Sequence, residues 1–200
     1  DPLGKEKIIA FMTGALLGTG APCTSRFSAV TKTPLTGIMA ASSCGGPFGE
    51  GLKNAGWDGI LIAGKSKTPV YLAVSTDGVE FMDATNLWGK DAMDTQKILG
   101  EKEGILAIGQ AGENLVRVAN IVSGHRYLGR AGMGAVMGSK NLKAIIAMGK
   151  AFQIVPKDKA TFEKLRKRSL KYIKASPFTG DGYKNYGTAS HLNYCNTQGT

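Results

Sequence analysis

Two glycine-rich segments, each ahead of a predicted helix, carry the residues best suited to bind an anion. They are "SSCGGPFG" (residues 42–49) and "GHRYLGRAGMGAVMG" (124–138). Free backbone N–H groups at a helix start bind anions, and glycine lets a ligand approach the backbone closely. The segments supply Ser43, Gly45 and Gly46, and then Arg126, Gly129, Arg130 and Gly132. Two such sites facing one cleft fit a ligand with two phosphates, or two ligands with one phosphate each.

Arg26, upstream of the first segment, can add a bidentate phosphate contact. Neither segment matches a known phosphate motif: GxxxxGK[ST] is absent, and "GRAGMG" reverses the glycine order of the dinucleotide fingerprint. Spacing alone therefore predicts a generic anion cradle. The alternative is that these glycines only allow helix and sheet to pack closely.

Other candidate sites are weaker. The two histidines, His125 and His191, are far apart in the sequence and lack Cys or acidic neighbours at ligand spacing, which argues against zinc. Cys44, beside a predicted helix start, is either a thiol of lowered pKa or a small core residue. Basic residues are not interleaved with aromatic ones, so we expect no nucleic-acid binding.

Composition narrows the class of protein. The 200 residues carry a formal net charge of +10, which suits an anionic partner, although the basic segment 157–174 is equally a solvated helix face. Three widely spaced cysteines favour a reducing compartment, and we expect a cytoplasmic protein. No apolar run approaches the length of a membrane span. The ends of the sequence indicate a piece of a longer protein.

The elements that would position these residues follow from hydrophobic pattern and turn signals. We predict strands over 7–14, 26–34, 58–65, 104–112, 115–123 and 142–150, and a hairpin over 69–84 turning at Asp77-Gly78. We predict helices over 46–56, 91–100, 132–141 and 157–174, the last with Asp158 as N-cap. Composition shifts near 151–156, and we place a domain boundary between 153 and 154.

A faint internal repeat links the two glycine-rich segments. "SRFSAVTK" (25–32) resembles "VRVANIVS" (116–123), and each precedes a glycine-rich stretch, a Leu-Lys pair and an apolar strand ending in Gly-Lys. This alignment pairs Arg26 with Arg117 and Leu52 with Leu142. It predicts two copies of one β-loop-α-β unit.

Five long motifs and one short one resemble the N-terminal part of the aldehyde ferredoxin oxidoreductase family. They are residues 13–37, 45–72, 83–91, 109–123, 124–145 and "YGTA" at 186–189. The resemblance implies an α+β fold in which residues 1–153 form a base of two related β-rich halves that binds tungstopterin. Residues 154–200 would begin a helical domain. The resemblance also implies a tungsten or molybdenum atom held by two pterins beside a [4Fe–4S] cluster. Magnesium would lie at the pterin phosphates.

Carried over by position, the resemblance assigns cofactor binding to Arg26, Ser43, Gly45, Arg126, Tyr127 and Gly129. The main-chain oxygens of Ser43 and Tyr127 would bind the magnesium. Ser43 stands where well-known members have Asn, Cys44 where they have Ser, and Tyr127 where they have a small residue, which indicates a divergent branch of the family. No catalytic residue and no cluster ligand is assigned within these 200 residues.

The resemblance implies oxidation of aldehydes to carboxylates, with electrons passed through the cluster to ferredoxin or another carrier. The alternative is a tungsten subunit of a benzoyl-coenzyme A reductase-like complex, acting on an acyl-coenzyme A. A non-redox phosphate-binding module is the third reading. A homo-oligomer and a larger redox complex are both left open.

Overall fold

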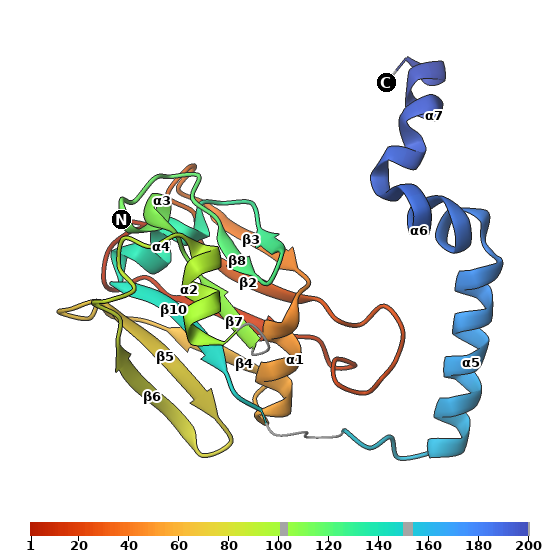
Figure 1. The fold of residues 1–200 in the computed structure, drawn as a ribbon, viewed down its shortest axis with the longest axis horizontal. Coiled ribbons are helices and arrows are strands. Elements are labelled where there is room, and N and C mark those ends of the chain that lie inside the picture. The colour runs from red at the N-terminus through yellow and green to blue at the C-terminus, as the bar shows by residue number, and fades with distance from the viewer. Residues whose placement is uncertain (101–103, 150–153, 200) are drawn as a thin grey trace. The chain divides into compact units, whose positions relative to one another are not determined.

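The computed structural model describes residues 1–100, 104–149 and 154–199, and the chain forms two compact units, Asp1–Ile154 and Val155–Thr200. The first unit contains two β-sheets with short helices, and the second is helical (Figure 1). The predicted boundary after residue 153 falls beside residues 150–153, which lie outside the described ranges. No helix among the described residues has the length and apolar character needed to cross a membrane.

The first sheet has four antiparallel strands in the order β3-β2-β1-β4. Its strands are β1 (Ile9–Thr13), β2 (Phe27–Lys32), β3 (Met39–Cys44) and β4 (Gly59–Ile62), with helix α1 (Pro47–Asn54) between the last two. Strand β2 alternates buried and half-buried residues, as a sheet with one face on the core requires. β3 and β4 are its edge strands.

The second sheet has six strands in the order β6-β5-β10-β7-β8-β9. They are β5 (Val70–Ser75), β6 (Gly78–Asp83), β7 (Gly104–Ala107), β8 (Ile121–Ser123), β9 (Arg126–Leu128) and β10 (Leu142–Ala147). Helices α2 (Ala92–Leu99), α3 (Gln110–Glu113) and α4 (Met133–Ser139) connect them. β10 pairs in parallel with β5 and antiparallel with β7.

The two sheets share one topology. The run β1-β2-β3-α1-β4 gives the order β3-β2-β1-β4, and the run β7-β8-β9-α4-β10 gives the matching order β9-β8-β7-β10. The predicted α+β fold of two related β-rich halves is therefore confirmed. The alignment is wrong in detail, because Leu52 lies within helix α1 whereas Leu142 begins strand β10. The strand predicted over 142–150 ends at Lys150, which lies outside the described residues.

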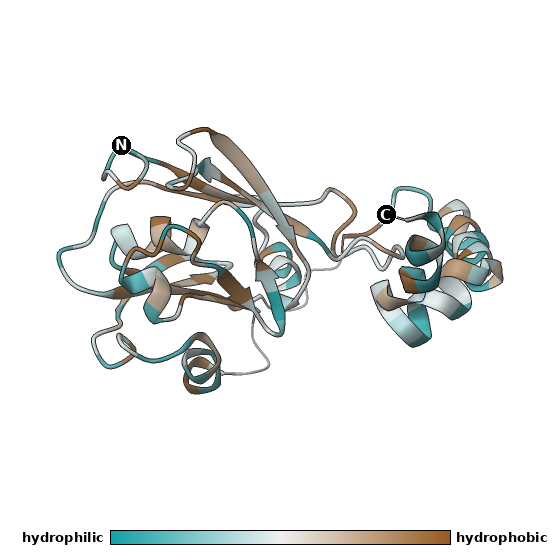
Figure 2. Cartoon of the chain, turned by 90° about the horizontal axis from the view of Figure 1, so that it is seen from above, coloured by the Kyte–Doolittle hydropathy of each residue, from teal (hydrophilic) through white to brown (hydrophobic). Residues whose placement is uncertain are grey.

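A core of apolar side chains joins the halves. Phe48 of α1 packs edge-on against Phe11 and Phe27, with ring centroids 6.0 and 5.2 Å away. These rings belong to a cluster that also includes Leu106, Val136 and Ile145 of the second half. In Figure 2 the strands of this unit are mostly coloured hydrophobic. The halves therefore share one core.

One ion pair lies deep in the second half. Lys143 of β10 is fully buried, and its ammonium contacts the Glu113 carboxylate and donates to the carbonyl of Lys90 at 2.6 Å. The second Glu113 oxygen accepts from the Gly89 N–H at 2.9 Å. Buried charges need this complete pairing. The pair fixes the loop before α2 against β10.

The second unit consists of α5 (Lys159–Ala175), a π-helical turn (Pro177–Gly182), α6 (Tyr183–Tyr186), a 3₁₀ turn (Gly187–His191) and α7 (Leu192–Gln198). The predicted N-cap of α5 is confirmed, because the Asp158 carboxylate accepts from the Thr161 N–H at 3.0 Å. Within the part of the chain that the structure describes, none of the residues in these helices is buried.

Candidate cofactor-binding site

The predicted site residues lie where the two sheets meet. β3 ends the first sheet and β9 ends the second, and these two edge strands contact each other. Pairing does not continue from β3 to β9 in the described sheets. We call this junction of β3 and β9 the seam. Edge strands carry unpaired N–H and C=O groups, so the seam offers main-chain donors and acceptors to a ligand.

Arg26 reaches the seam from the first half. It directly precedes β2, it is exposed, and its Nη2 donates to the carbonyl oxygen of Ser43 at 2.8 Å. Ser43 lies in β3 opposite Ser28 of β2, and their hydroxyl oxygens are 2.7 Å apart. The Arg26 guanidinium is therefore held at the end of β3 by a main-chain oxygen, and its other donors remain available.

Arg126 reaches the same place from the second half. It begins β9, is exposed, and its Cγ would lie 3.9 Å from a Cβ added to Gly45. The preceding turn packs on α1, since a Cβ on Gly124 would lie 3.1 Å from Cδ of Pro47. Arginine side chains from both halves thus reach the end of β3, Arg26 at the Ser43 carbonyl oxygen and Arg126 beside Gly45.

Cys44 lies within reach of both arginine charges but is a core residue. Its side chain is buried, and its Sγ is 2.9 Å from the carbonyl oxygen of Gly45. Burial raises the pKa of the Cys44 thiol, and the charges of Arg26 and Arg126 only partly offset this. The alternative of a reactive thiol with a lowered pKa is therefore wrong. Cys44 remains a protonated packing group at neutral pH.

The helix start that was predicted to cradle an anion is closed. The N–H of Phe48, in the first turn of α1, donates to the Ser123 hydroxyl at 3.4 Å. Gly46, the N-cap, has φ of 99°, and a Cβ there would lie 2.5 Å from the Ser123 carbonyl oxygen. The first turn of α1 packs against β8, so this helix start is occupied by a contact with the other half.

The glycines of the two segments divide into two kinds. A Cβ on Gly132, Gly134 or Gly138 would collide with backbone carbonyls of the second half, so these glycines allow close packing. Gly45 and Gly129 differ, because the nearest atoms to a Cβ there would be 3.9 and 4.0 Å away. Their backbones are open to a ligand. These two are the glycines that the resemblance assigns to the cofactor.

The remaining two predicted residues lie along β9 and beyond it. Tyr127 is in β9, opposite Val122 of β8, and its side chain is exposed. Gly129 follows β9 and lines a cavity of about 450 Å³ with Thr33, Ala40 and Arg130. Because Ala40 lies at the start of β3 and Gly45 follows its end, the six predicted residues extend along the seam instead of forming one cluster.

The sequence missed two residues that support the site. Ser28 positions Ser43, and Ser123, which is buried, holds the start of α1. Ser28 could have been found, because it alternates with the apolar Phe27 and Ala29 in β2 and so must face away from the core. Ser123 gave no signal, because its role depends on a contact with the other half.

Comparison with known proteins shows to which family the chain belongs. A sequence profile described as aldehyde ferredoxin oxidoreductase, N-terminal domain, matches residues 1–149. The chain belongs to this family. Tungsten-containing aldehyde ferredoxin oxidoreductases of Pyrococcus abyssi and Pyrococcus furiosus are 45% and 42% identical to it across its whole length. The chain spans 34% of the length of each, about a third.

The chain is also similar to two proteins named for other reactions. The WOR-like subunit of an aliphatic sulfonate oxidoreductase of Pyrococcus furiosus is 40% identical over 74% of the chain and 26% of its own length. Among solved structures, the BamBC active site complex of benzoyl-coenzyme A reductase, with bound 1,5-dienoyl-CoA, matches with a TM-score of 0.83. The two chains are 38% identical, and the match covers 87% of this chain and 27% of the other.

Proposed function

We propose that this chain is the cofactor-binding part of a tungsten pterin oxidoreductase that oxidises aldehydes to carboxylates. Electrons would pass through a [4Fe–4S] cluster, held outside these residues, to ferredoxin or another carrier in the cytoplasm. The observation that carries the proposal is that arginines from different halves both reach the end of β3, Arg26 at the Ser43 carbonyl oxygen and Arg126 beside the open backbone of Gly45. The full-length tungsten relatives support it.

The residues present fit the proposed cofactor. Arg26 and Arg126 would bind the phosphates of a bis-pterin, because guanidinium groups match phosphate geometry. The main-chain oxygens of Ser43 and Tyr127, on the two edge strands, would bind magnesium, which prefers oxygen ligands. Gly45 and Gly129 would let the pterins approach the backbone. When bound, the metal would supply the redox chemistry, and this chain would position it. Molybdenum in place of tungsten fits the same residues.

The test is metal and pterin content of the natural full-length protein, purified anaerobically. We expect about one tungsten or molybdenum and four or more iron atoms per chain. Arg26→Ala and Arg126→Ala should each lower pterin and tungsten content several-fold, because a charge-assisted phosphate contact is lost. Arg166→Ala is the matched control, since this half-buried arginine belongs to α5 of the second unit, where it pairs with Glu163. Full metal content in both seam variants would refute the assignment.

The solved BamBC neighbour supports a second candidate, a tungsten subunit of a benzoyl-coenzyme A reductase-like complex. Co-purifying redox subunits and activity with an acyl-coenzyme A, but not with aldehydes, would favour it. A metal-free, iron-free protein that still binds phosphate at the seam would favour the non-redox phosphate-binding module. Whether the enzyme works alone, as a homo-oligomer or in a larger complex is decided by the same purification.

A further inference from the structure

The hairpin turn that leads into Arg126 is held by contacts with both halves. β8 and β9 are joined by Gly124 and His125, because Ser123 pairs with Arg126 across the two strands. Gly124 has a positive φ of 57°, which glycine adopts without strain. A loop of two residues leaves little freedom between its strands. A contact that fixes Gly124 therefore also fixes the start of β9, where Arg126 lies.

Gln96 of α2 binds both main-chain groups of Gly124. Its Oε1 accepts from the Gly124 N–H at 2.7 Å, and its Nε2 donates to the Gly124 carbonyl oxygen at 3.3 Å. Gln96 is buried, with 5% of its surface exposed. These two hydrogen bonds give the turn a defined position, because losing them would leave buried polar groups without partners.

The first half contacts the same turn through the start of α1. The Phe48 N–H donates to the Ser123 hydroxyl at 3.4 Å, and a Cβ on Gly124 would lie 3.1 Å from Cδ of Pro47. Pro47 comes two residues after Gly45, whose open backbone lies beside the arginine of β9. The turn therefore links the loop of one half to the arginine of the other.

From these contacts we propose that Gln96 is a positioning residue for the cofactor: it holds Arg126 beside Gly45, where the arginine binds a cofactor phosphate. Gln96 would act through the turn and not by contact with the cofactor. The inference rests on the proposed function, because it concerns the same site. A guanidinium group binds phosphate well only when its N–H groups are directed at the phosphate oxygens, so the residue that orients it matters as well.

The rate at which pterin leaves the natural full-length holoenzyme tests this role. Gln96→Met nearly keeps the size of the side chain and loses both hydrogen bonds, so it should speed pterin release at least about fivefold. In the presence of Arg126→Ala the same substitution should change the rate by less than about 1.5-fold, whereas beside Arg26→Ala its full effect should remain. Gln96→Leu repeats the test if Gln96→Met fails to fold. Additive effects of Gln96→Met and Arg126→Ala would overturn the proposal.

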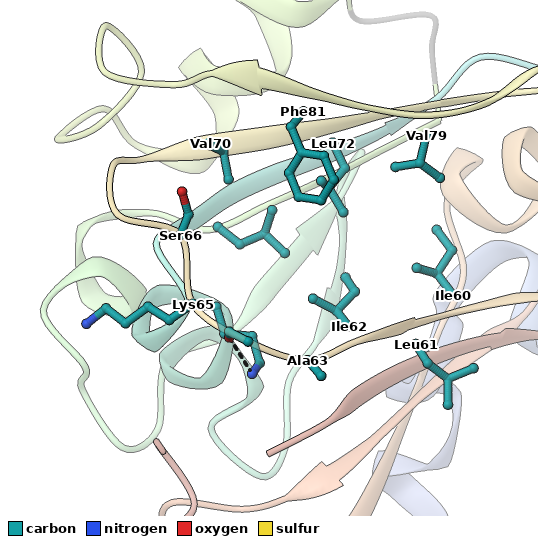
Figure 3. A pocket seen from close by; sticks show the side chains of 13 residues that line it. Ile60, Leu61, Ile62, Ala63, Lys65, Ser66, Val70, Leu72, Val79 and Phe81 are labelled. Carbon is teal, nitrogen blue, oxygen red and sulfur yellow. Dashed lines mark hydrogen bonds between the residues drawn. The ribbon is translucent and has the colours of Figure 1, made fainter. Parts of the chain in front are cut away.

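Lys140→Met is the matched control for a general loss of stability. Lys140 is also buried, and its ammonium donates to the carbonyl oxygens of Lys7 and Gly64, the latter at 3.1 Å. It lines the apolar pocket between β4 and β6, which are the edge strands opposite to the seam in the two sheets (Figure 3). Lys140→Met should lower the midpoint of denaturant unfolding without speeding pterin release. Equally fast pterin release from Lys140→Met and Gln96→Met would also overturn the proposal.

A natural protein that contains no pterin would refute the proposed function and not the role of Gln96. Inorganic pyrophosphate is then the probe, and its binding to the same protein is measured by calorimetry. Gln96→Met should weaken that binding at least about fivefold, and not when Arg126→Ala is present. Pyrophosphate binding that is unchanged by Gln96→Met would show that the turn does not position the arginine.

Discussion

The buried thiol of Cys44, near the seam, makes the stability of the fold depend on pH. Its pKa lies above the ordinary value of 9.0 because the thiol is buried, so the folded chain holds this proton more tightly than the unfolded chain does. The resulting stability is complete below pH 9 and decreases as pH rises from there toward the folded pKa. The free energy of unfolding of the natural protein, relative to Cys44→Ala, should therefore be constant below pH 9.0 and fall as pH rises above it. A difference that stays constant with pH would contradict this.

Gly45 and Gly46 are adjacent, but substitution by alanine should affect the stability of the fold at Gly46 and cofactor binding at Gly45. Gly46→Ala places a Cβ at positive φ, 2.5 Å from the Ser123 carbonyl oxygen, and should destabilise the fold by about 2–4 kcal/mol. Gly45→Ala meets no atom nearer than 3.9 Å, so its stability should change by less than about 1 kcal/mol. Gly45→Ala should instead lower the pterin content.

Denaturant unfolding and pterin analysis of both variants check this contrast. A Gly45→Ala variant with full cofactor and unchanged stability would show that the open backbone there is not used. A Gly46→Ala variant as stable as the parent would show that α1 does not depend on its contact with β8.

The buried pair of Lys143 and Glu113 should be costly to break from one side. Lys143→Met leaves the Glu113 carboxylate buried without its cation, and should reduce the free energy of unfolding by about 3–5 kcal/mol. Removing both charges, as Lys143→Met with Glu113→Gln, should recover part of the loss. A double-mutant cycle measured by denaturant unfolding gives the coupling, and additive losses would show that the two groups act independently.

At the scale of elements, hydrophobic pattern located most strands and helices. The predicted strands over 7–14 and 58–65 correspond to β1 and β4, and the predicted helix over 91–100 contains α2. The hairpin turn is one residue earlier than predicted, since Ser75 pairs with Gly78 and the loop is Thr76–Asp77. The strand predicted over 115–123 is reduced to β8, because the chain before Ile121 forms turns.

The pattern missed two strands, β3 and β9, and these are the two edge strands that form the seam. β3, "MAASSC", consists mostly of Ala and Ser, which have low strand propensity and no alternation of polarity. It forms a strand because β2 supplies a full partner, from Phe27↔Cys44 to Lys32↔Met39. The anion cradle was therefore assigned to a helix start when the exposed groups belong to a strand edge. The glycine-rich segment had pointed to Ser43 and Gly45, but as parts of a helix start and not of a strand edge.

The helix cap of α2 gives an element-scale prediction. The Asp91 carboxylate accepts from the N–H groups of Met93 and Asp94, each at 2.8 Å. These bonds, with the Asp94 N–H first, hold the pKa of Asp91 below its ordinary value of 3.8. Asp91→Ala should lower the melting temperature at pH 7, and the difference should shrink as pH falls below 3.8, where the carboxylate loses its charge. Asp91→Asn, which keeps a capping oxygen, is the control in thermal melts.

At the scale of the whole molecule, the two units differ in what holds them together. The first unit has a core shared by both halves, whereas the second exposes Tyr186, Leu192 and Tyr194 by about two thirds each. Short helices without a buried face are marginal in water. A peptide of residues 155–200 should therefore show weak helical circular dichroism and no cooperative melt, and a sharp two-state transition would contradict this.

The two halves that meet at the seam have matching strand orders, as two subunits of a symmetric dimer would. A protein of a single half, with the order β3-β2-β1-β4, could reach the same arrangement only by pairing with a second copy about a two-fold axis. The axis would pass between β3 and β9. The halves nevertheless differ at this junction, because Arg26 lies ahead of β2 whereas Arg126 begins β9. A ligand bound at the seam would therefore contact different side chains from two halves of the same topology.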